Sequence, residues 1–79
     1  MKIAVVLHTT LQRQFPEAKA GKLSLDLPSG STLEDLLRRM HIKLDLQNTL
    51  LVVNGRNVEL NHTLLEGDQV HLIPAISGG

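Results

Sequence analysis

The sequence contains no cysteine, and Phe15 is the only residue among phenylalanine, tyrosine and tryptophan. The first absence excludes a disulfide framework, a thiolate metal site and a cysteine nucleophile. The second predicts an aliphatic core and removes the aromatic platforms on which nucleic-acid bases stack. Eight basic residues balance eight acidic ones, so charge gives no reason to expect nucleic acid or an anionic membrane as a partner.

Long hydrophobic runs are absent as well. The apolar run at residues 3–7 ends at His8, which is too short for an export segment. It is also far below the roughly 20 residues that a membrane-spanning helix needs. We therefore expect a cytoplasmic protein, and the length of 79 residues predicts one compact domain.

Five short segments have the apolar or alternating pattern of β-strands. They cover residues 2–8, 23–27, 50–53, 56–58 and 69–73. In the first segment both alternating sets of side chains are largely apolar, which predicts a strand covered to some degree on both faces and central in its sheet. Asn54 and Gly55 tolerate positive φ and predict a tight turn between the third and fourth segments. Residues 9–20 show no sustained period and are predicted to form a loop.

One segment has the pattern of an amphipathic helix. Its apolar side chains recur at helical spacing and form one stripe, made of Leu33, Leu36, Leu37 and Met40. Just before the stripe, Ser31 and Glu34 fit a capping box, in which side chains bind backbone groups that the first turn leaves free. Because such a stripe needs a sheet to lie on, the sequence predicts an α+β fold. We expect a mixed sheet of four to five strands packed on one main helix, in the β-grasp arrangement.

The sequence ends in Ile-Pro-Ala-Ile-Ser-Gly-Gly at residues 73–79. Pro74 is expected to halt the last strand, because proline cannot donate a hydrogen bond to a ladder. The chain is therefore predicted to divide into a β-grasp domain at residues 1–74 and a flexible tail at residues 75–79.

The tail has a shape suited to entering another protein. Gly78 and Gly79 carry no side chains, so the end of the chain can be slender and extended. From Ala75 to Gly79 an extended chain reaches roughly 17 Å. That length can place a terminal carboxylate inside the active site of a partner while the folded domain stays outside.

This ending resembles the C-terminus of a known family. Residues 65–68 read Leu-Glu-Gly-Asp, and residues 70–79 read Val-His-Leu-Ile-Pro-Ala-Ile-Ser-Gly-Gly. The pattern is similar to that of the ubiquitin-like sulfur carriers of molybdenum-cofactor and thiamine biosynthesis. The small subunit of molybdopterin synthase is the nearer match, through the Ile-Pro-x-x-Ser-Gly-Gly ending. The resemblance continues in Ser-Thr-Leu-Glu-Asp-Leu-Leu at residues 31–37 and in Val-Val-Asn-Gly-Arg at residues 52–56.

The resemblance implies a carrier protein and not an enzyme. In such families an adenylyltransferase related to ubiquitin-activating enzymes uses ATP to turn the terminal carboxylate into an acyl-adenylate. Sulfur then replaces one oxygen, and the resulting thiocarboxylate donates sulfur to a precursor in a synthase. On this chain the reacting carboxylate would be that of Gly79, with Gly78 next to it. Molybdopterin is the favoured product, and thiamine thiazole is the alternative.

The implied partners are the activating adenylyltransferase and a synthase large subunit or other sulfur-accepting enzyme. ATP would be used by the activating partner, and the carrier itself would bind no cofactor. The residues expected to contact these partners are Ile73, Pro74, Ala75, Ile76 and Ser77. Strand alternation also places Val6, Ile73 and Ile76 on or near the sheet face opposite the helix, where grouped apolar side chains would form a docking surface.

Two other functions would use the same features. Gly79 can be expected to form isopeptide bonds with lysines if the chain is a protein modifier. In a plain binding module the folded domain would act alone and the glycines would be incidental. An autonomous enzyme is not expected, because no nucleophile and base converge. No metal site is expected either, because the histidines at positions 8, 41, 62 and 71 show no helical i, i+4 pairing.

Overall fold

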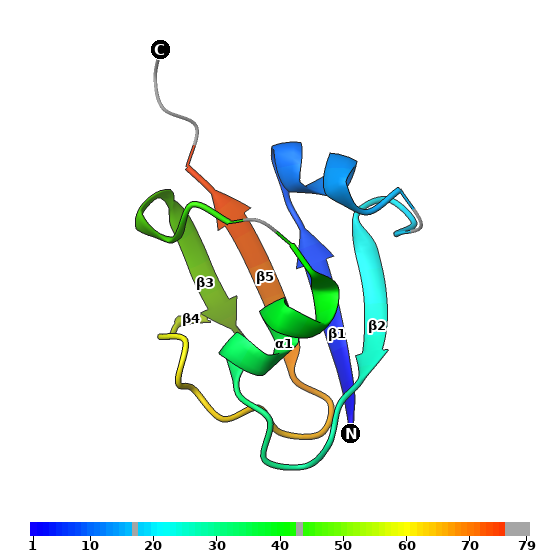
Figure 1. Cartoon of the computed structure of the whole chain (residues 1–79), viewed down its shortest axis with the longest axis vertical. Coiled ribbons are helices and arrows are strands. Elements are labelled where there is room, and N and C mark those ends of the chain that lie inside the picture. The colour runs from blue at the N-terminus through cyan, green and yellow to red at the C-terminus, as the bar shows by residue number, and fades with distance from the viewer. Residues whose placement is uncertain (17, 43, 76–79) are drawn as a thin grey trace.

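The computed structural model describes residues 1–16, 18–42 and 44–75, which form a five-stranded sheet crossed by an α-helix (Figure 1). The strands are β1 (Lys2–Leu7), β2 (Lys22–Asp26), β3 (Thr49–Val53), β4 (Arg56–Asn57) and β5 (Gln69–Pro74). The helix is α1 (Leu33–Met40), and two short 3₁₀ segments are η1 (Thr9–Gln14) and η2 (Leu46–Asn48). Within these described ranges, no helix has the length and apolar character needed to cross a membrane.

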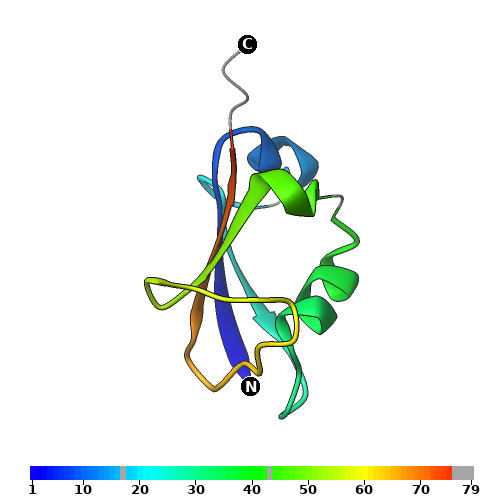
Figure 2. The ribbon, with the colours of Figure 1, turned by 90° about the vertical axis from the view of Figure 1, so that its left-hand side faces the viewer.

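The strands lie in the order β2-β1-β5-β3-β4. The neighbours β1 and β5 run parallel, and the other neighbouring pairs run antiparallel. Viewed from the side, α1 lies across one face of the sheet, while the opposite face is left open by the described elements (Figure 2). The predicted α+β class, with a mixed sheet on one main helix, is confirmed, and the arrangement is a β-grasp.

The sheet face beneath α1 forms the hydrophobic core. The inward side chains of the two central strands are fully buried, namely Ile3, Val5, Leu7, Val70 and Leu72. The predicted helix stripe packs on them, with Leu33, Leu36 and Met40 buried and Leu37 partly buried. Because successive side chains of a strand point to opposite faces, the residues between these core positions must face away from the helix.

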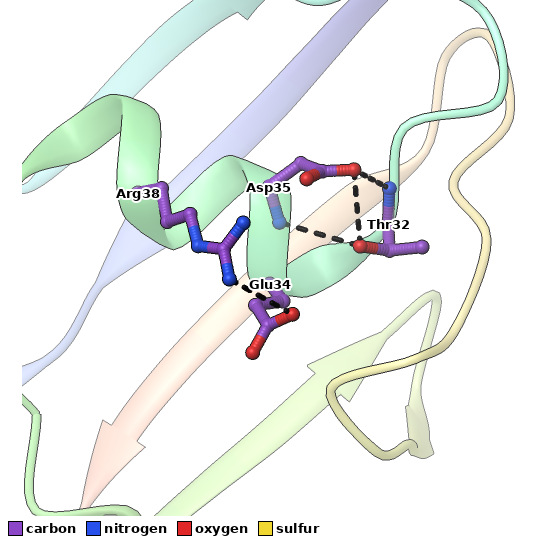
Figure 3. Close-up of polar contacts among 4 residues, drawn as sticks. All are labelled: Thr32, Glu34, Asp35 and Arg38. Carbon is purple, nitrogen blue, oxygen red and sulfur yellow. Dashed lines mark hydrogen bonds and ion pairs between the residues drawn. The ribbon is translucent and has the colours of Figure 1, made fainter.

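The N-terminus of α1 is capped one residue later than the sequence analysis predicted (Figure 3). The Thr32 hydroxyl accepts a hydrogen bond from the Asp35 backbone N–H at 3.3 Å, and the Asp35 carboxylate accepts one from the Thr32 N–H at 2.9 Å. The predicted box of Ser31 and Glu34 is therefore wrong. Ser31 is buried, and its hydroxyl instead donates to the Pro28 carbonyl at 2.7 Å, so it is committed to the preceding turn.

The two acidic residues of the first helical turn have different roles. Hydrogen bonds from the backbone N–H of Thr32 and then from its hydroxyl lower the pKa of the Asp35 carboxyl below its ordinary value. Glu34 instead pairs with Arg38 at 3.5 Å, one turn along the helix (Figure 3). Both partners of that ion pair are largely exposed, so the pair adds little stability. The start of α1 is thus set by Thr32 and Asp35.

The segment after β1 differs from the predicted loop, because residues 9–14 form the 3₁₀ segment η1. Leu11 is buried and joins the core, and one anchoring side chain gives no period that a sequence pattern could display. The chain then turns back into β2 at Gly21, which has a φ of 76°. A Cβ atom there would lie 2.6 Å from the Leu7 carbonyl oxygen, so the turn requires glycine.

Candidate functional site

The predicted tail leaves the sheet from one of its central strands, β5, which lies between β1 and β3. The last residue of β5 is Pro74, one position beyond the predicted end of the strand. The next residue, Ala75, still donates its N–H to the Asn48 carbonyl at 2.5 Å. Because backbone groups alternate along a strand, Pro74 turns its nitrogen away from β3, toward β1 beyond Leu7. Next along that strand, the His8 carbonyl accepts a hydrogen bond from the Leu11 N–H and needs no donor from β5, so β5 tolerates proline at its end.

Three of the predicted contact residues belong to this end of β5, which we call the tail root (residues 73–75). Ile73 and Pro74 are half-buried, and Ala75 is exposed. The other predicted site residues lie outside the described part of the chain, namely Ile76, Ser77, Gly78 and Gly79. The structure therefore defines the place from which the tail begins.

An apolar patch lies beside the tail root on the sheet face opposite α1. Cross-strand pairing sets Leu50 opposite Ile73, and it sets Val52 and Val6 on the two sides of His71. Leu50 is 51% exposed, and the other apolar members are half-buried. We call these residues, Val6, Leu50, Val52 and Ile73, the open-face patch. The predicted placement of Val6 and Ile73 on the face opposite the helix is confirmed.

His8 and His71 meet on the same face, which the sequence analysis did not predict. Nε2 of His8 and Nδ1 of His71 lie 2.9 Å apart, and the two ring centroids are separated by 5.2 Å. One ring nitrogen donates and the other accepts in this hydrogen bond, and the tautomers decide which is which. The residues are 63 positions apart, and only the parallel pairing of β1 with β5 brings them together. No spacing rule within one element could have found the pair.

A small hollow and an apolar surface flank the tail root. A hollow of about 250 Å³ borders the tail root, and its polar lining comes from η1, from the turn before β3 and from the first residue of β3. Among residues 1–16, 18–42 and 44–75, no group of three or more His, Asp or Glu side chains is arranged to hold a metal ion. The surroundings of the tail root therefore consist of an apolar surface on the sheet and the end of strand β5.

The chain resembles solved structures over its whole length. SAMP1 from Haloferax volcanii superposes with a TM-score of 0.81 at 20% identity, covering 100% of both chains. A chain in the complex of subunits 1 and 2 of molybdopterin-converting factor from Helicobacter pylori 26695 superposes with a TM-score of 0.67 at 20% identity, again covering 100% of both chains. At these identities the likeness establishes the fold alone.

Sequence comparisons add one curated relative and one family. Threonine–tRNA ligase from Protochlamydia amoebophila (strain UWE25) is 41% identical over 49 residues, which are 62% of this chain. The chain spans only 8% of the length of that ligase. The sequence model of the ThiS family matches residues 10–79, which includes most of the fold and the tail. The chain therefore belongs to the ThiS family and has the ubiquitin-like β-grasp fold of its sulfur carriers.

Proposed function

We propose that this chain is a sulfur carrier that acts as a co-substrate through the carboxylate of Gly79. The observation that carries the proposal is the match to the ThiS family, which runs through residue 79. The structure supports it by placing the start of the tail at the end of a central strand, beside the open-face patch. A partner bound to the open-face patch would therefore lie next to the start of the tail, within reach of the terminal carboxylate.

The proposed chemistry starts from a carboxylate, which is a poor electrophile until it gains a leaving group. An oxygen of the Gly79 carboxylate attacks the α-phosphorus of ATP on an activating adenylyltransferase, and pyrophosphate leaves. A hydrosulfide-level sulfur donor then attacks the acyl carbon, and AMP departs with the electrons of the broken C–O bond. The product is a thiocarboxylate, which holds sulfur on a chain that contains no cysteine. The carrier needs no general base or cofactor of its own, and the ATP is consumed by the partner in the cytoplasm.

Two parts of the molecule divide the work of partner recognition. The open-face patch offers exposed aliphatic area around Leu50, and such area stabilises a complex when a partner removes it from water. The tail root and the residues that follow, from Ile73 to Ser77, would line the entrance to the partner's active site. Past Ala75 the four remaining residues reach about 14 Å when extended. The patch therefore supplies affinity, and the tail supplies the reacting group.

We further propose that the thiocarboxylate serves molybdopterin formation, with a synthase large subunit as the accepting partner. The support is the Ile-Pro-x-x-Ser-Gly-Gly ending at residues 73–79, together with the fold shared with a chain of the molybdopterin-converting factor complex. Thiamine thiazole formation is the alternative pathway for the same carrier chemistry. Incubating the loaded carrier with each precursor and its synthase would distinguish the two products.

The test of the carrier function is the intact mass of the protein after incubation with ATP, an activating enzyme and a sulfur donor. We expect a mass gain equal to the exchange of one oxygen for sulfur, and no gain when ATP is left out. Repeated absence of the gain with an enzyme that loads its own carrier would defeat the proposal. If Gly79 instead forms isopeptide bonds, the chain would be recovered attached to lysine side chains of other proteins.

A second candidate is a binding module that uses the folded domain without a reacting end. The observation that favours it is the 49-residue match to a much longer ligase, of which this chain spans 8%. Deleting Gly79 separates the two functions. A binding module would keep its full activity after the deletion, whereas a sulfur carrier would lose the ability to be loaded.

A further inference from the structure

The turn that precedes β3 is organised around Asp45. Its carboxylate accepts hydrogen bonds from the Gln47 backbone N–H at 3.2 Å and from the Asn48 side-chain amide at 2.8 Å. Its carbonyl accepts one from the Asn48 N–H at 3.0 Å and one from the Thr49 hydroxyl at 2.6 Å. Asp45 is thus the N-cap of η2, and it holds Asn48 at both its main-chain N–H and its side chain.

The same Asn48 holds the tail root from the other side. Its carbonyl accepts the hydrogen bond from the Ala75 N–H, which continues the β3–β5 ladder past the pairing of Thr49 with Pro74. Because the backbone groups of Pro74 face away from β3, this bond is the next main-chain link to β3 after that of Ile73. A displacement of the Asn48 backbone therefore acts directly on Ala75, the last residue that the structure describes.

We propose that Asp45 is a positioning residue for the tail: by fixing the η2 turn, it presents the Asn48 carbonyl to Ala75 and so sets the direction in which the chain leaves the sheet. The inference rests on the proposed function, because only a reacting chain end depends on its direction. In this role the exposed turn at residues 45–48 orients the tail, which neither the hydrophobic core nor the open-face patch does.

The reach of the tail explains why direction matters. Four residues beyond Ala75 extend about 14 Å, so a swing of roughly 15° at the tail root would move the terminal carboxylate by about 4 Å. Reacting groups need placement to about 1 Å, and a misplacement of that size can slow a reaction about a hundredfold. Fixing the tail root reduces the range of positions that the terminal carboxylate can take inside the partner.

Substitution of Asp45 tests the proposal more specifically than substitution of Asn48 or Ala75 would. The bond to Ala75 uses a main-chain carbonyl that every residue possesses, so substitution of Asn48 would leave that acceptor in place. Asp45 and Asn48 are both exposed, so removal of the Asp45 carboxylate takes nothing from the core. Asp45→Ala is therefore expected to release the turn while the sheet and α1 remain folded.

The first measurement is amide hydrogen exchange at Ala75 by NMR on the full-length chain. In Asp45→Ala we expect exchange at Ala75 to rise by roughly tenfold, as for the loss of a capping residue, while the His71 amide in β5 stays unchanged. Asp45→Asn keeps one acceptor oxygen and should restore part of the protection, because asparagine is also a good cap. Asp26→Ala, on the exposed edge strand β2, removes a carboxylate from the other side of the sheet and should leave Ala75 unaffected.

The second measurement is the rate of sulfur loading by the activating enzyme. Asp45→Ala should lower kcat by about tenfold or more and leave KM within about twofold, because the docking surface is intact. Thr49→Val removes only the hydroxyl bond to the Asp45 carbonyl and should give a smaller change in the same direction. This second variant tests the turn if Asp45→Ala is poorly folded.

Three results would overturn the inference. These are unchanged exchange at Ala75 in Asp45→Ala, increased exchange with normal loading kinetics, and a raised KM with an unchanged kcat, which would make Asp45 a docking contact. Failure of the wild-type chain to be loaded is a separate outcome that defeats the proposed function. In that case the exchange comparison still decides whether Asp45 holds Ala75 in place.

Discussion

Both faces of the sheet carry aliphatic side chains, but those under α1 are buried and those on the opposite face stay partly exposed. On the face under α1, Val5 and Leu72 are fully buried, so their contribution is to stability. On the opposite face, Leu50 remains 51% exposed and Ile73 half-buried, although both lie on strands that run through the middle of the sheet. The same strands therefore stabilise the fold through one face, and in the proposed carrier they would bind a partner through the other.

The largest effect is expected on the covered face. Leu36→Ala in α1 removes a side chain with 0% exposure and should lower the free energy of unfolding by about 2–5 kcal/mol. Domains of this size have a total of about 4–12 kcal/mol, so part of the population should unfold. Urea denaturation followed by circular dichroism measures the loss. A change below about 0.5 kcal/mol would mean that α1 is not the cover of the core.

The next effect concerns recognition and should leave stability nearly unchanged. Leu50→Asp places a charge in the open-face patch, and we expect it to weaken binding to the activating enzyme at least about tenfold, or roughly 1.4 kcal/mol. Leu65→Asp is the matched control, because Leu65 is 67% exposed in the loop before β5. Titration calorimetry of both variants provides the comparison. Equal affinities of the Leu50→Asp and Leu65→Asp variants for the activating enzyme would mean that the open-face patch is not a binding surface for this enzyme.

A smaller effect is expected at the start of α1. Thr32→Ala removes the hydroxyl that accepts the Asp35 N–H and should lower the free energy of unfolding by roughly 1 kcal/mol. Ser31→Ala tests the alternative cap, and its effect should come from the lost bond to the Pro28 carbonyl without a change in helix content. Helix content measured by circular dichroism that falls in Ser31→Ala but not in Thr32→Ala would restore the cap predicted from the sequence.

The smallest effect is a dependence of stability on pH. The pKa of Asp35 lies below its ordinary value of 3.8 in the folded chain, so the unfolded chain binds a proton more readily than the folded one. The ionised carboxylate therefore stabilises the fold above about pH 4, and this contribution is lost as the pH falls through the lower, folded-state value. In Asp35→Asn the stability difference from the wild type should shrink as the pH is lowered through this range. A difference that stays constant from neutral pH to pH 3 would contradict the assigned hydrogen bonds.

The sequence predicted the features that depend on repeated patterns. Strand alternation placed Val6 and Ile73 on the sheet face opposite the helix, and the stripe from Leu33 to Met40 identified α1. The turn at Asn54 and Gly55 was also predicted, and both residues have positive φ. These features are set by local periodicity and turn chemistry, which one segment of sequence contains in full.

The features that the sequence did not predict depend on contacts between distant segments. His8 and His71 meet through the pairing of two strands that stand at opposite ends of the chain, and Asn48 meets Ala75 in the same way across β3 and β5. The capping error arose because Ser31 and Thr32 are both good caps, and the burial of Ser31 with its hydrogen bond to the Pro28 carbonyl decides between them. The burial of Leu11 in η1 was not predicted, because a single buried side chain leaves no periodic pattern in the sequence.

The most direct test of the division between a docking body and a reacting tail is a competition experiment. A variant lacking Gly79 would be added in increasing amounts while the activating enzyme loads the wild-type chain with sulfur. The account predicts that the variant is not loaded and yet inhibits competitively, with an inhibition constant close to the KM of the wild type. Loading of the shortened variant, or its failure to compete while remaining folded, would contradict the account.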